Sequence, residues 1–345
     1  MGCTFSIFKN IGNTLTIEYP QTFTINHRSF RVIKQLGEGG YSYVYLVREV
    51  SDGQQNEYAL KKILAQTPEQ LAVAKSELEI HGQFADHPGV LTLLDSAVVP
   101  LLKNDRDDEH FEVYLLFPVF KDGDLMQYLG KGPKNTRCFT SVQALRIFDQ
   151  ICAAIENMHN TRPAPYAHWD LKPANILLSF NGGVQSTGGV PHSSPMRRPE
   201  GTSGAPIPLA VLSDFGSARL ARVEVRGRRE ALALQEFAEM YASAPYRPPE
   251  LWDVSSNAKV DERVDVWALG CLLYALLYRE GPFDWQVDQN SIALAVMSGR
   301  VRYPNDPSAH YPAPLHQLVE FMLQTDAEAR PHVGAVRARV AELLE

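Results

Sequence analysis

The sequence predicts an α+β protein with two unlike lobes, and two patterns lead to that expectation. Strand-like segments rich in β-branched and aromatic residues fill the first third of the chain, and after Phe117 the apolar residues recur at helical spacing. The chain has 345 residues, of which 45% are hydrophobic and 21% are charged. This length and composition suit a globular protein with one large domain or two small ones.

Charge and cysteine content exclude several other classes. A net charge of -7 gives no general affinity for nucleic acid or an anionic membrane, so we expect no nucleic-acid partner. None of the four cysteines belongs to a Cys-x-x-Cys pair, which argues against a structural zinc site or a redox dithiol. No apolar run approaches the roughly 18 residues of a membrane span.

Strands are expected from Thr22 onward, after 21 weakly patterned residues. Five segments have strand-like composition: Phe30–Leu36, Tyr43–Val47, Tyr58–Leu64, Val90–Leu94 and Val113–Phe117. A helix interrupts them near Pro68, which suits the first helical position. Thr67 is a suitable N-cap for it, and Gln70 is placed to complete a capping box.

The remainder of the chain predicts helices. Thr140 or Ser141 caps a long helix whose apolar residues share one face. Two further helices are expected at Val264–Tyr278 and Leu315–Leu323. The first of these contains the longest apolar run of the chain, around Leu269–Tyr278, so it should be a buried core helix.

One segment, Ser179–Pro208, departs from this pattern. More than half of its residues are Gly, Pro or Ser, a composition typical of flexible segments. It lies between two short apolar strands, Ile176–Leu178 and Leu209–Leu212. We therefore expect a flexible surface loop at the tip of an elongated hairpin.

A glycine cluster at residues 37–42 lies between the first two long strands. Glycine lets backbone N–H groups approach phosphate oxygens without a clash with Cβ. A dinucleotide-binding turn needs a helix directly after the glycines, whereas a strand follows here, so that interpretation is rejected. Such a cluster is often a plain turn, and its meaning depends on the motifs that follow.

Chemistry-bearing residues follow the glycine cluster in order. Lys61 follows an apolar pair on the third long strand, and Glu77 lies in the helix after it. The octet His168-Trp169-Asp170-Leu171-Lys172-Pro173-Ala174-Asn175 places an amide five positions after an acid, and Asp214-Phe215-Gly216 follows a short strand. An acid that accepts or orients a hydroxyl proton and an amide that binds metal have this spacing.

Three further features suggest an architectural role. Glu250 ends the segment Pro248-Pro249-Glu250, and Arg330 is placed to pair with it. Asp265 begins the apolar helix and is expected to accept hydrogen bonds from the backbone of the loop that carries Asp170.

From about Thr22 to Val340 the chain resembles the eukaryotic protein kinases, whose signature elements occur here in order. Within them it resembles the Numb-associated kinase family, and in particular a branch of myristoylated and palmitoylated serine/threonine kinases. Five segments carry this narrower resemblance: Leu36–Val44, Tyr58–Lys61, Ala231–Glu236, Asp261–Arg263 and Gly281–Asp284. Ala231–Glu236 corresponds to an extra helix in the activation segment of that branch.

The resemblance implies a bilobal protein kinase fold, with a small β-rich N-lobe and a larger helical C-lobe. The kinase domain would span residues 22–340 after an N-terminal tail, 1–21. Its parts are expected at four ranges: N-lobe 22–117, hinge 118–120, C-lobe 121–340 and, within the C-lobe, the flexible insertion 179–208.

The resemblance also implies ATP and Mg²⁺ as cofactors. Asn175 and Asp214 would hold the magnesium ion. Phe117 would be the gatekeeper beside the adenine-binding hinge. The residues expected around ATP are Leu36, Gly37, Gly39, Gly40, Val44, Ala59, Lys61, Phe117 and Val119.

Four residues are expected to carry the transfer of the γ-phosphoryl group. Glu77, in preference to Glu79, would hold Lys61 toward the phosphates. Asp170 would orient the substrate hydroxyl, and Lys172 would neutralise charge on the transferring group.

The expected substrates are serine or threonine residues of other proteins, with tyrosine as a minor possibility. Lys172 is typical of serine/threonine kinases, and Ser243 matches a hydroxyl that contacts the catalytic aspartate and lysine in them. A pseudokinase scaffold is the main alternative, disfavoured because every core polar residue is present. A small-molecule phosphotransferase would leave Ser243 and the segment Pro249-Glu250 unexplained.

Trp169 departs from the kinase pattern, which has arginine at this position. That arginine commonly pairs with a phosphate on the activation loop, and an indole cannot. We therefore predict that activity does not depend on activation-loop phosphorylation. Ser42, in place of the third glycine, and Pro248, in place of an alanine, are lesser departures.

The N-terminus predicts a lipid anchor. Gly2 and Ser6 fit the N-myristoylation pattern, and Cys3 is a natural palmitoylation site. A single myristoyl chain binds membranes only marginally, so a second signal is required. The alternative is an ordinary frayed terminus. Acylation of Gly2 and Cys3 would place the kinase on the cytoplasmic face of endomembranes such as Golgi or vacuole, with a cytosolic pool.

Overall fold

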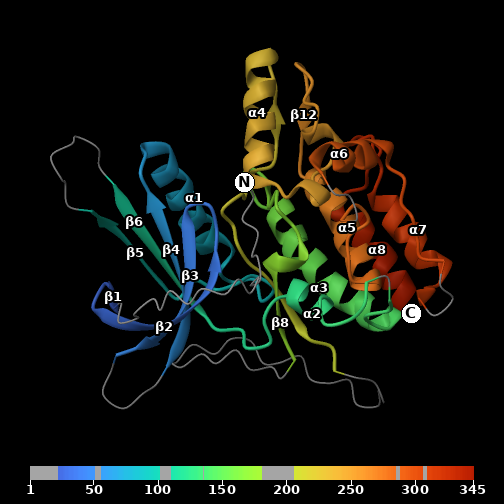
Figure 1. Ribbon diagram of the computed structural model, residues 1–345. Coiled ribbons are helices and arrows are strands. Elements are labelled where there is room, and N and C mark those ends of the chain that lie inside the picture. The colour runs from blue at the N-terminus through green and yellow to red at the C-terminus, as the bar shows by residue number, and fades with distance from the viewer. Residues whose placement is uncertain are drawn as a thin grey trace.

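The computed structural model describes residues 22–50, 56–101, 110–134, 136–180, 206–284, 288–305 and 309–345. Figure 1 shows a strand-rich N-lobe with one long helix beside a larger helical C-lobe, as the sequence predicts. The expected lipid-anchor tail, residues 1–21, lies outside the described residues. Residues 181–205, the greater part of the expected insertion, also lie outside the described residues.

The N-lobe is built on a six-stranded sheet in the order β1-β2-β3-β4-β6-β5, with antiparallel pairing throughout. Its strands are β1 (Thr22–Ile25), β2 (Arg28–Glu38), β3 (Ser42–Glu49), β4 (Glu57–Ala65), β5 (Asp95–Pro100) and β6 (Phe111–Pro118). One face of the sheet buries a cluster around Phe30 and Leu60. The other face, around Leu115 and Phe117, packs against Ala74 of the long helix.

The predicted strand at Val90–Leu94 is wrong, and β5 begins only at Asp95. Val90 makes an isolated bridge to Leu212 of the C-lobe, and the Leu91 N–H donates to the Leu212 carbonyl at 2.8 Å. These apolar residues are buried because they join the two lobes. Their composition is therefore strand-like, although they are not part of the sheet.

The long N-lobe helix α1 (Pro68–Phe84) begins where the sequence predicts. The Thr67 hydroxyl accepts from the Gln70 N–H at 3.2 Å, as an N-cap does. The Gln70 side chain, however, accepts from the backbone N–H of Gln66 rather than that of Thr67. The expected capping box is thus displaced by one residue.

The C-lobe is helical and packs around one large apolar core. Its helices are α2 (Leu125–Leu129), α3 (Ser141–His159), α4 (Arg228–Tyr241), α5 (Arg263–Tyr278), α6 (Gln289–Ser298), α7 (Ala313–Met322) and α8 (Val333–Leu344). Thr140, one of the two predicted caps, forms a complete capping box with Gln143 at the start of α3. The apolar helix α5 is buried from Val264 to Tyr278, as predicted. Helix α8 continues past the expected boundary at 340.

Short strands and single 3₁₀ turns position the loops of the C-lobe. The strands are β7 (Tyr166–Ala167), β8 (Ile176–Ser179), β9 (Leu209–Leu212), β10 (Arg219–Leu220), β11 (Val223–Glu224) and β12 (Lys259–Val260). The 3₁₀ turns are Pro173–Asn175, Ala244–Tyr246 and Pro249–Leu251. Strands β8 and β9 pair antiparallel, which confirms the hairpin predicted on either side of the insertion.

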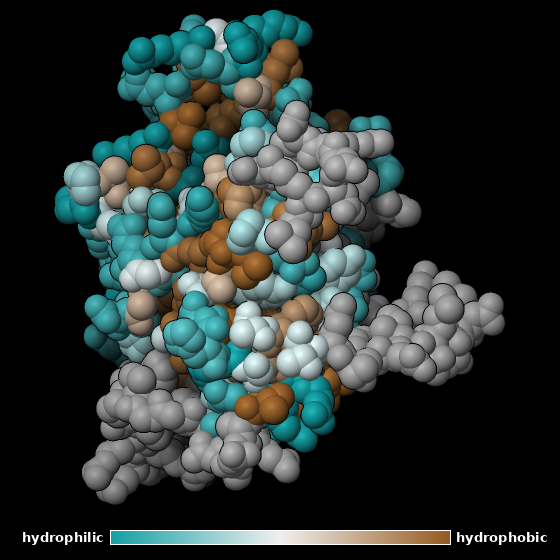
Figure 2. Space-filling model, turned by 90° about the vertical axis from the view of Figure 1, so that its left-hand side faces the viewer, coloured by the Kyte–Doolittle hydropathy of each residue, from teal (hydrophilic) through white to brown (hydrophobic). Residues whose placement is uncertain are grey.

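Helix α4 projects from the body of the protein at the top of Figure 1. In Figure 2 the surface at this end is mostly hydrophilic, and hydrophobic residues gather below it. Its inner face buries Ala231, Leu234 and Ala238. Among the described residues, no helix combines the length and apolar character needed to cross a membrane.

Candidate active site

Strand register assembles the expected nucleotide-binding residues. Gly37 lies opposite Val44, and Val44 lies opposite Lys61 on the next strand. Ala59, two residues before Lys61 and therefore on the same face of β4, lies opposite Phe117. These residues lie far apart in the sequence, but they line one continuous face of the sheet.

The glycine loop closes between β2 and β3. The Gly39 N–H donates to the Ser42 carbonyl at 2.7 Å, so the turn is stabilised by its own backbone. Gly40 has open space where a Cβ would lie, and Leu36 is partly exposed at 41%. The loop therefore presents backbone and an exposed apolar side chain at the edge of the sheet.

The connection between the lobes begins where β6 ends. Phe117 is 6% exposed, Pro118 closes the strand, and Val119 follows outside it, half-buried. Beyond the connection the Asp124 carboxylate caps α2 by accepting from the Gln127 N–H at 2.8 Å. The residues expected at the gatekeeper and hinge are thus consecutive between the two lobes.

Lys61 joins two carboxylates from different elements. Its Nζ lies 2.6 Å from Glu77 Oε1 and 2.8 Å from Asp214 Oδ1. Glu77 is 3% exposed, whereas its competitor Glu79 is exposed to solvent. The preference for Glu77 over Glu79 as the partner of Lys61 is therefore confirmed.

The two carboxyls beside Lys61 differ in their pKa. Burial disfavours the charged form of both. For Asp214, the charge and hydrogen bond of Lys61 outweigh burial and hold the pKa well below its usual range. For Glu77, burial is the largest influence, and with the nearby Asp214 charge it raises the pKa despite Lys61. Asp214 is thus an anion, which suits the magnesium-binding role expected for it.

His81 was missed by the sequence analysis, although it lies one helical turn after Glu77 on the buried face of α1. Its ring lies 4.9 Å from that of Phe117 and 4.7 Å from that of Phe215, and the Phe215 ring lies 5.3 Å from that of His168. Burial lowers the pKa of His81 to about 3, so its ring is neutral. A row of aromatic rings in tilted and edge-to-face contact therefore connects the two lobes.

Asp170 is surrounded by donors that fix its carboxylate. Lys172 Nζ lies 2.6 Å from Asp170 Oδ2, and the Ser243 N–H donates to Oδ1 at 2.9 Å. Lys172 also donates to the Ser243 hydroxyl at 2.9 Å. The contact predicted for Ser243 is thus present, but it reaches Asp170 through the backbone N–H.

Asp265 anchors the loop that carries Asp170, as predicted. Its carboxylate accepts from the backbone N–H groups of His168 at 2.8 Å and Trp169 at 2.9 Å. His159 of α3 lies 2.9 Å from the same carboxylate. Trp169 has a φ of 67°, a conformation that is rare for bulky residues, and the bond to Asp265 helps to hold it.

The residues expected to bind magnesium fit that ion. The Asn175 amide nitrogen donates to the Asp170 carbonyl at 2.8 Å, so the amide is oriented by the loop that carries Asp170. The Asn175 Oδ1 is buried and has no hydrogen-bond partner among the described residues. Magnesium prefers oxygen ligands, and the amide oxygen of Asn175 with the anionic carboxylate of Asp214 meets that preference.

Trp169, which stands where the kinase pattern has arginine, packs its ring among apolar side chains. Its side chain is 5% exposed and belongs to a small core with the inner face of α4. Phe237 of α4 meets it edge to face, with ring centres 5.6 Å apart. The Arg219 guanidinium lies over both rings, 5.4 Å from Trp169 and 4.2 Å from Phe237.

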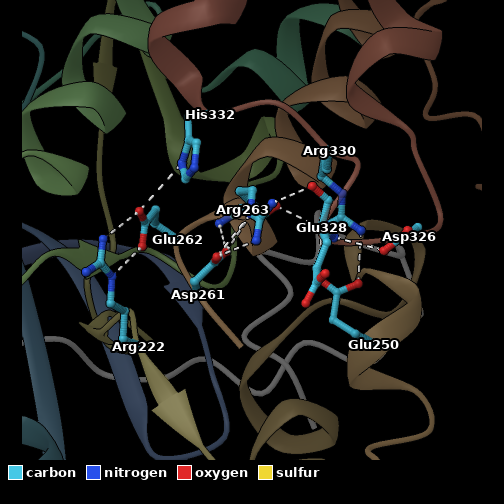
Figure 3. A network of polar contacts seen from close by, with 9 residues as sticks. All are labelled: Arg222, Glu250, Asp261, Glu262, Arg263, Asp326, Glu328, Arg330 and His332. Atoms are coloured by element: carbon cyan, nitrogen blue, oxygen red, sulfur yellow. Dashed lines mark hydrogen bonds and ion pairs between the residues drawn. The ribbon is translucent and has the colours of Figure 1, made fainter. Parts of the chain in front are cut away.

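Figure 3 shows the ion pairs that fasten the segment after α4 to the C-lobe. Arg330 grips the Glu250 carboxylate with two bonds, 2.8 Å and 2.9 Å long, and also donates to the Arg263 carbonyl. This confirms the predicted Glu250–Arg330 pair. Nearby, Glu262 lies 3.3 Å from Arg222 and 3.6 Å from His332.

A cavity of about 100 Å³ opens between the glycine loop, α1 and the end of α4. Its charged lining comes from Lys61, Glu77, Asp170 and Asp214. Its apolar lining includes Ile63, Val73, Ala74, Met240 and Tyr241. Lys61, the Asp170 carboxylate and the Asp214 carboxylate therefore line the same cavity.

This combination of a two-lobed fold, a lysine–carboxylate pair and a loop-borne aspartate defines a phosphotransferase of the protein kinase class. Residues 30–339 match the protein kinase domain, and the chain belongs to that family.

Its relatives define the class of substrate. The chain is 35% identical over 334 residues to serine/threonine-protein kinase 16 of Homo sapiens, and 34% identical to that of Rattus norvegicus, with 96% of both chains covered in each case. It is 32% identical over 381 residues to a probable serine/threonine-protein kinase of Dictyostelium discoideum, which covers 97% of this chain and 100% of that relative. The protein is therefore a serine/threonine protein kinase.

Proposed function

We propose that the protein transfers the γ-phosphoryl group of Mg-ATP to serine or threonine hydroxyls, with Asp170 as the residue that orients the hydroxyl. The observation that carries the proposal is the Asp170 carboxylate, which lies buried at 4% exposure between Lys172 and Ser243. A carboxylate held from two sides keeps its free lone pairs in one direction. A hydroxyl that approaches it is oriented for attack.

Each neighbouring residue has a matching role. Lys61, held by Glu77, binds the α- and β-phosphates, and the glycine loop covers them with backbone N–H groups. Asn175 and Asp214 would hold magnesium, which would supply positive charge to neutralise the phosphates. Lys172 donates toward the transferring group while it contacts Asp170. Catalysis in this arrangement consists of positioning and electrostatic stabilisation.

Activity and Asp170 are tested together by transfer of labelled phosphate to a generic serine/threonine substrate. We expect the wild type to label the substrate and Asp170→Asn, which keeps the shape of the side chain, to be nearly inactive. If neither protein labels the substrate but thermal shift shows that ATP binds, the protein is a scaffold. The scaffold alternative is disfavoured because Lys61, Asp170 and Asp214 are all present.

We also propose that the enzyme is active without a phosphate on its activation segment. In place of an arginine that needs a phosphate, Trp169 packs against Phe237 and under Arg219. Apolar packing of this kind is present in the unmodified chain. The segment around α4 is therefore ordered by its own side chains.

The narrower family and the cellular site are proposals as well. We place the chain in the myristoylated and palmitoylated branch of the Numb-associated kinases, and α4 overlaps the extra activation-segment helix of that branch. Acylation at Gly2 and Cys3 would hold the enzyme on the cytoplasmic face of endomembranes, Golgi or vacuole, beside a cytosolic pool. Two adjacent lipids give the stable anchoring that one myristoyl chain lacks.

A further inference from the structure

Arg247 is a buried cation near the catalytic aspartate. Its side chain is almost wholly enclosed, at 2% exposure for the residue, and its guanidinium lies 4.4 Å from the centre of the Trp252 ring. The Trp252 indole N–H donates back to the Arg247 carbonyl at 3.2 Å. Among the described residues, Arg247 Nε and Nη1 have no hydrogen-bond partner. Enclosing such a charge costs free energy, so a chemical reason for it is expected.

The bond that Arg247 does make leads to the active site. Its Nη2 donates to the Ala242 carbonyl at 3.0 Å. The next N–H along the chain belongs to Ser243 and donates to Asp170 Oδ1 at 2.9 Å. The Ala242 carbonyl and the Ser243 N–H are part of one planar peptide group. A single rigid plane therefore has Arg247 at one end and the Asp170 carboxylate at the other.

This peptide controls the orientation of the carboxylate. The other oxygen, Asp170 Oδ2, accepts from Lys172 at 2.6 Å and from Asn175 at 3.3 Å. Rotation of the Asp170 carboxylate about its own axis is thus limited by the Ser243 N–H on the opposite side. A cation on the carbonyl also polarises the peptide and strengthens the bond its N–H donates.

We propose that Arg247 is a positioning residue for phosphoryl transfer: it fixes the Ala242–Ser243 peptide so that the Ser243 N–H holds Asp170 in its reactive orientation. The proposal rests on the role of Asp170 proposed above. Ala242 directly follows α4, and its N–H donates to the Ala238 carbonyl at 2.9 Å. The same peptide therefore ties the end of the activation-segment helix to the catalytic carboxylate.

Arg247→Met separates this role from a merely structural one. Replacing a buried charge by an apolar side chain of similar length is often neutral or stabilising, so we expect no loss of thermal stability. The KM for ATP should stay unchanged, because the side-chain bond of Arg247 leads to Asp170 and not to the residues expected around ATP. The kcat should fall about 10- to 100-fold. Arg247→Lys, which retains a donor for the Ala242 carbonyl, should recover part of kcat.

Arg279→Met is the matched control. Arg279 also donates to a backbone carbonyl, that of Leu129 at 3.1 Å, and its Nε likewise has no partner among the described residues. It should keep wild-type kcat. A kcat for Arg247→Met within twofold of wild type, or an equal loss in Arg279→Met, overturns the proposal. Absence of transfer by the wild type would instead count against the proposed function.

A second pair of variants covers the case in which Arg247→Met does not fold. Trp252→Leu removes the ring beneath the guanidinium but leaves every charge in place, whereas Trp252→Phe keeps an aromatic face. We expect kcat to fall in Trp252→Leu and to be largely retained in Trp252→Phe. Equal, wild-type kcat in both variants contradicts the role of Arg247.

Discussion

Glu77 accepts a hydrogen bond from Lys61 at 2.6 Å. Glu77 lies on helix α1 and Lys61 on strand β4, so the pair depends on the packing of the helix against the sheet. The pair stands in a buried setting, since the side chains of Glu77 and Lys61 are 3% and 12% exposed. Asp214 joins from the C-lobe at 2.8 Å. Lys61, the residue proposed to bind the phosphates, is thus held by carboxylates from both lobes.

Weakening the contact between Glu77 and Lys61 should lower kinase activity. Hydrogen bonds between charged groups contribute about 1.5–3 kcal/mol, so Glu77→Gln should lower kcat/KM for ATP roughly 10- to 100-fold. Glu79→Gln, on the exposed face of the same helix, is the control and should behave as wild type. Steady-state kinetics at varied ATP concentration provide the test, and equal effects of the two substitutions would contradict the assignment.

We expect the position of helix α4 to depend on aromatic packing and not on a phosphate group attached to the activation segment. Treatment with a phosphatase should leave kcat unchanged, whereas Phe237→Ala should lower it, because Trp169 and Arg219 both lose their contact with the Phe237 ring. Leu232→Ala is the control, since Leu232 is 46% exposed. Hydrogen exchange over α4 should speed up in Phe237→Ala alone. A dephosphorylated enzyme without activity would refute this prediction.

The Glu250–Arg330 pair should be a strong contributor to stability. The Arg330 side chain is 0% exposed, and removing one partner of a buried pair costs about 3–5 kcal/mol because the other charge is left unpaired. Glu250→Gln should therefore lower the unfolding free energy measured in urea, and Glu250→Gln with Arg330→Met should lower it by less than the sum of the single changes.

An exposed pair on the same lobe is the reference for that measurement. Arg226 and Glu224 lie 3.1 Å apart, but their side chains are 81% and 64% exposed. Solvent screens such pairs, so Arg226→Ala should have little effect on unfolding. If the two pairs contribute equally, burial is not what makes the Glu250 pair strong.

Membrane attachment should depend on two lipids. Gly2→Ala should move the protein to the soluble fraction, because it removes the myristoylation acceptor. Cys3→Ser should leave only weak, reversible binding, since one myristoyl chain is a marginal anchor. Fractionation of cells with activity measured in both fractions provides the test, and kinase activity should be unchanged in both variants. A Gly2→Ala protein that stays on membranes would show that another feature anchors it.

Short-range signals explain where the sequence predictions agreed with the structure. The cap at Thr140, the apolar run of α5 and the hairpin strands around the insertion depend on residues close in sequence, which local chemistry governs. The motif around Asp170 was recognisable because the residues that perform its chemistry are almost contiguous. By contrast, Val90 and Leu91 are apolar because the two lobes meet on them, and composition cannot distinguish that from a strand.

The sequence by itself determined the two-lobed α+β fold, the order of the kinase motifs and the residues proposed to carry phosphoryl transfer, because periodicity and motif spacing depend only on the order of residues along the chain. Tertiary structure alone decided which partners meet. It placed the His81 ring in contact with those of Phe117 and Phe215 and joined Arg247 to Asp170 through a peptide of the activation segment. These contacts connect residues far apart in sequence, so they exist only once both lobes have packed.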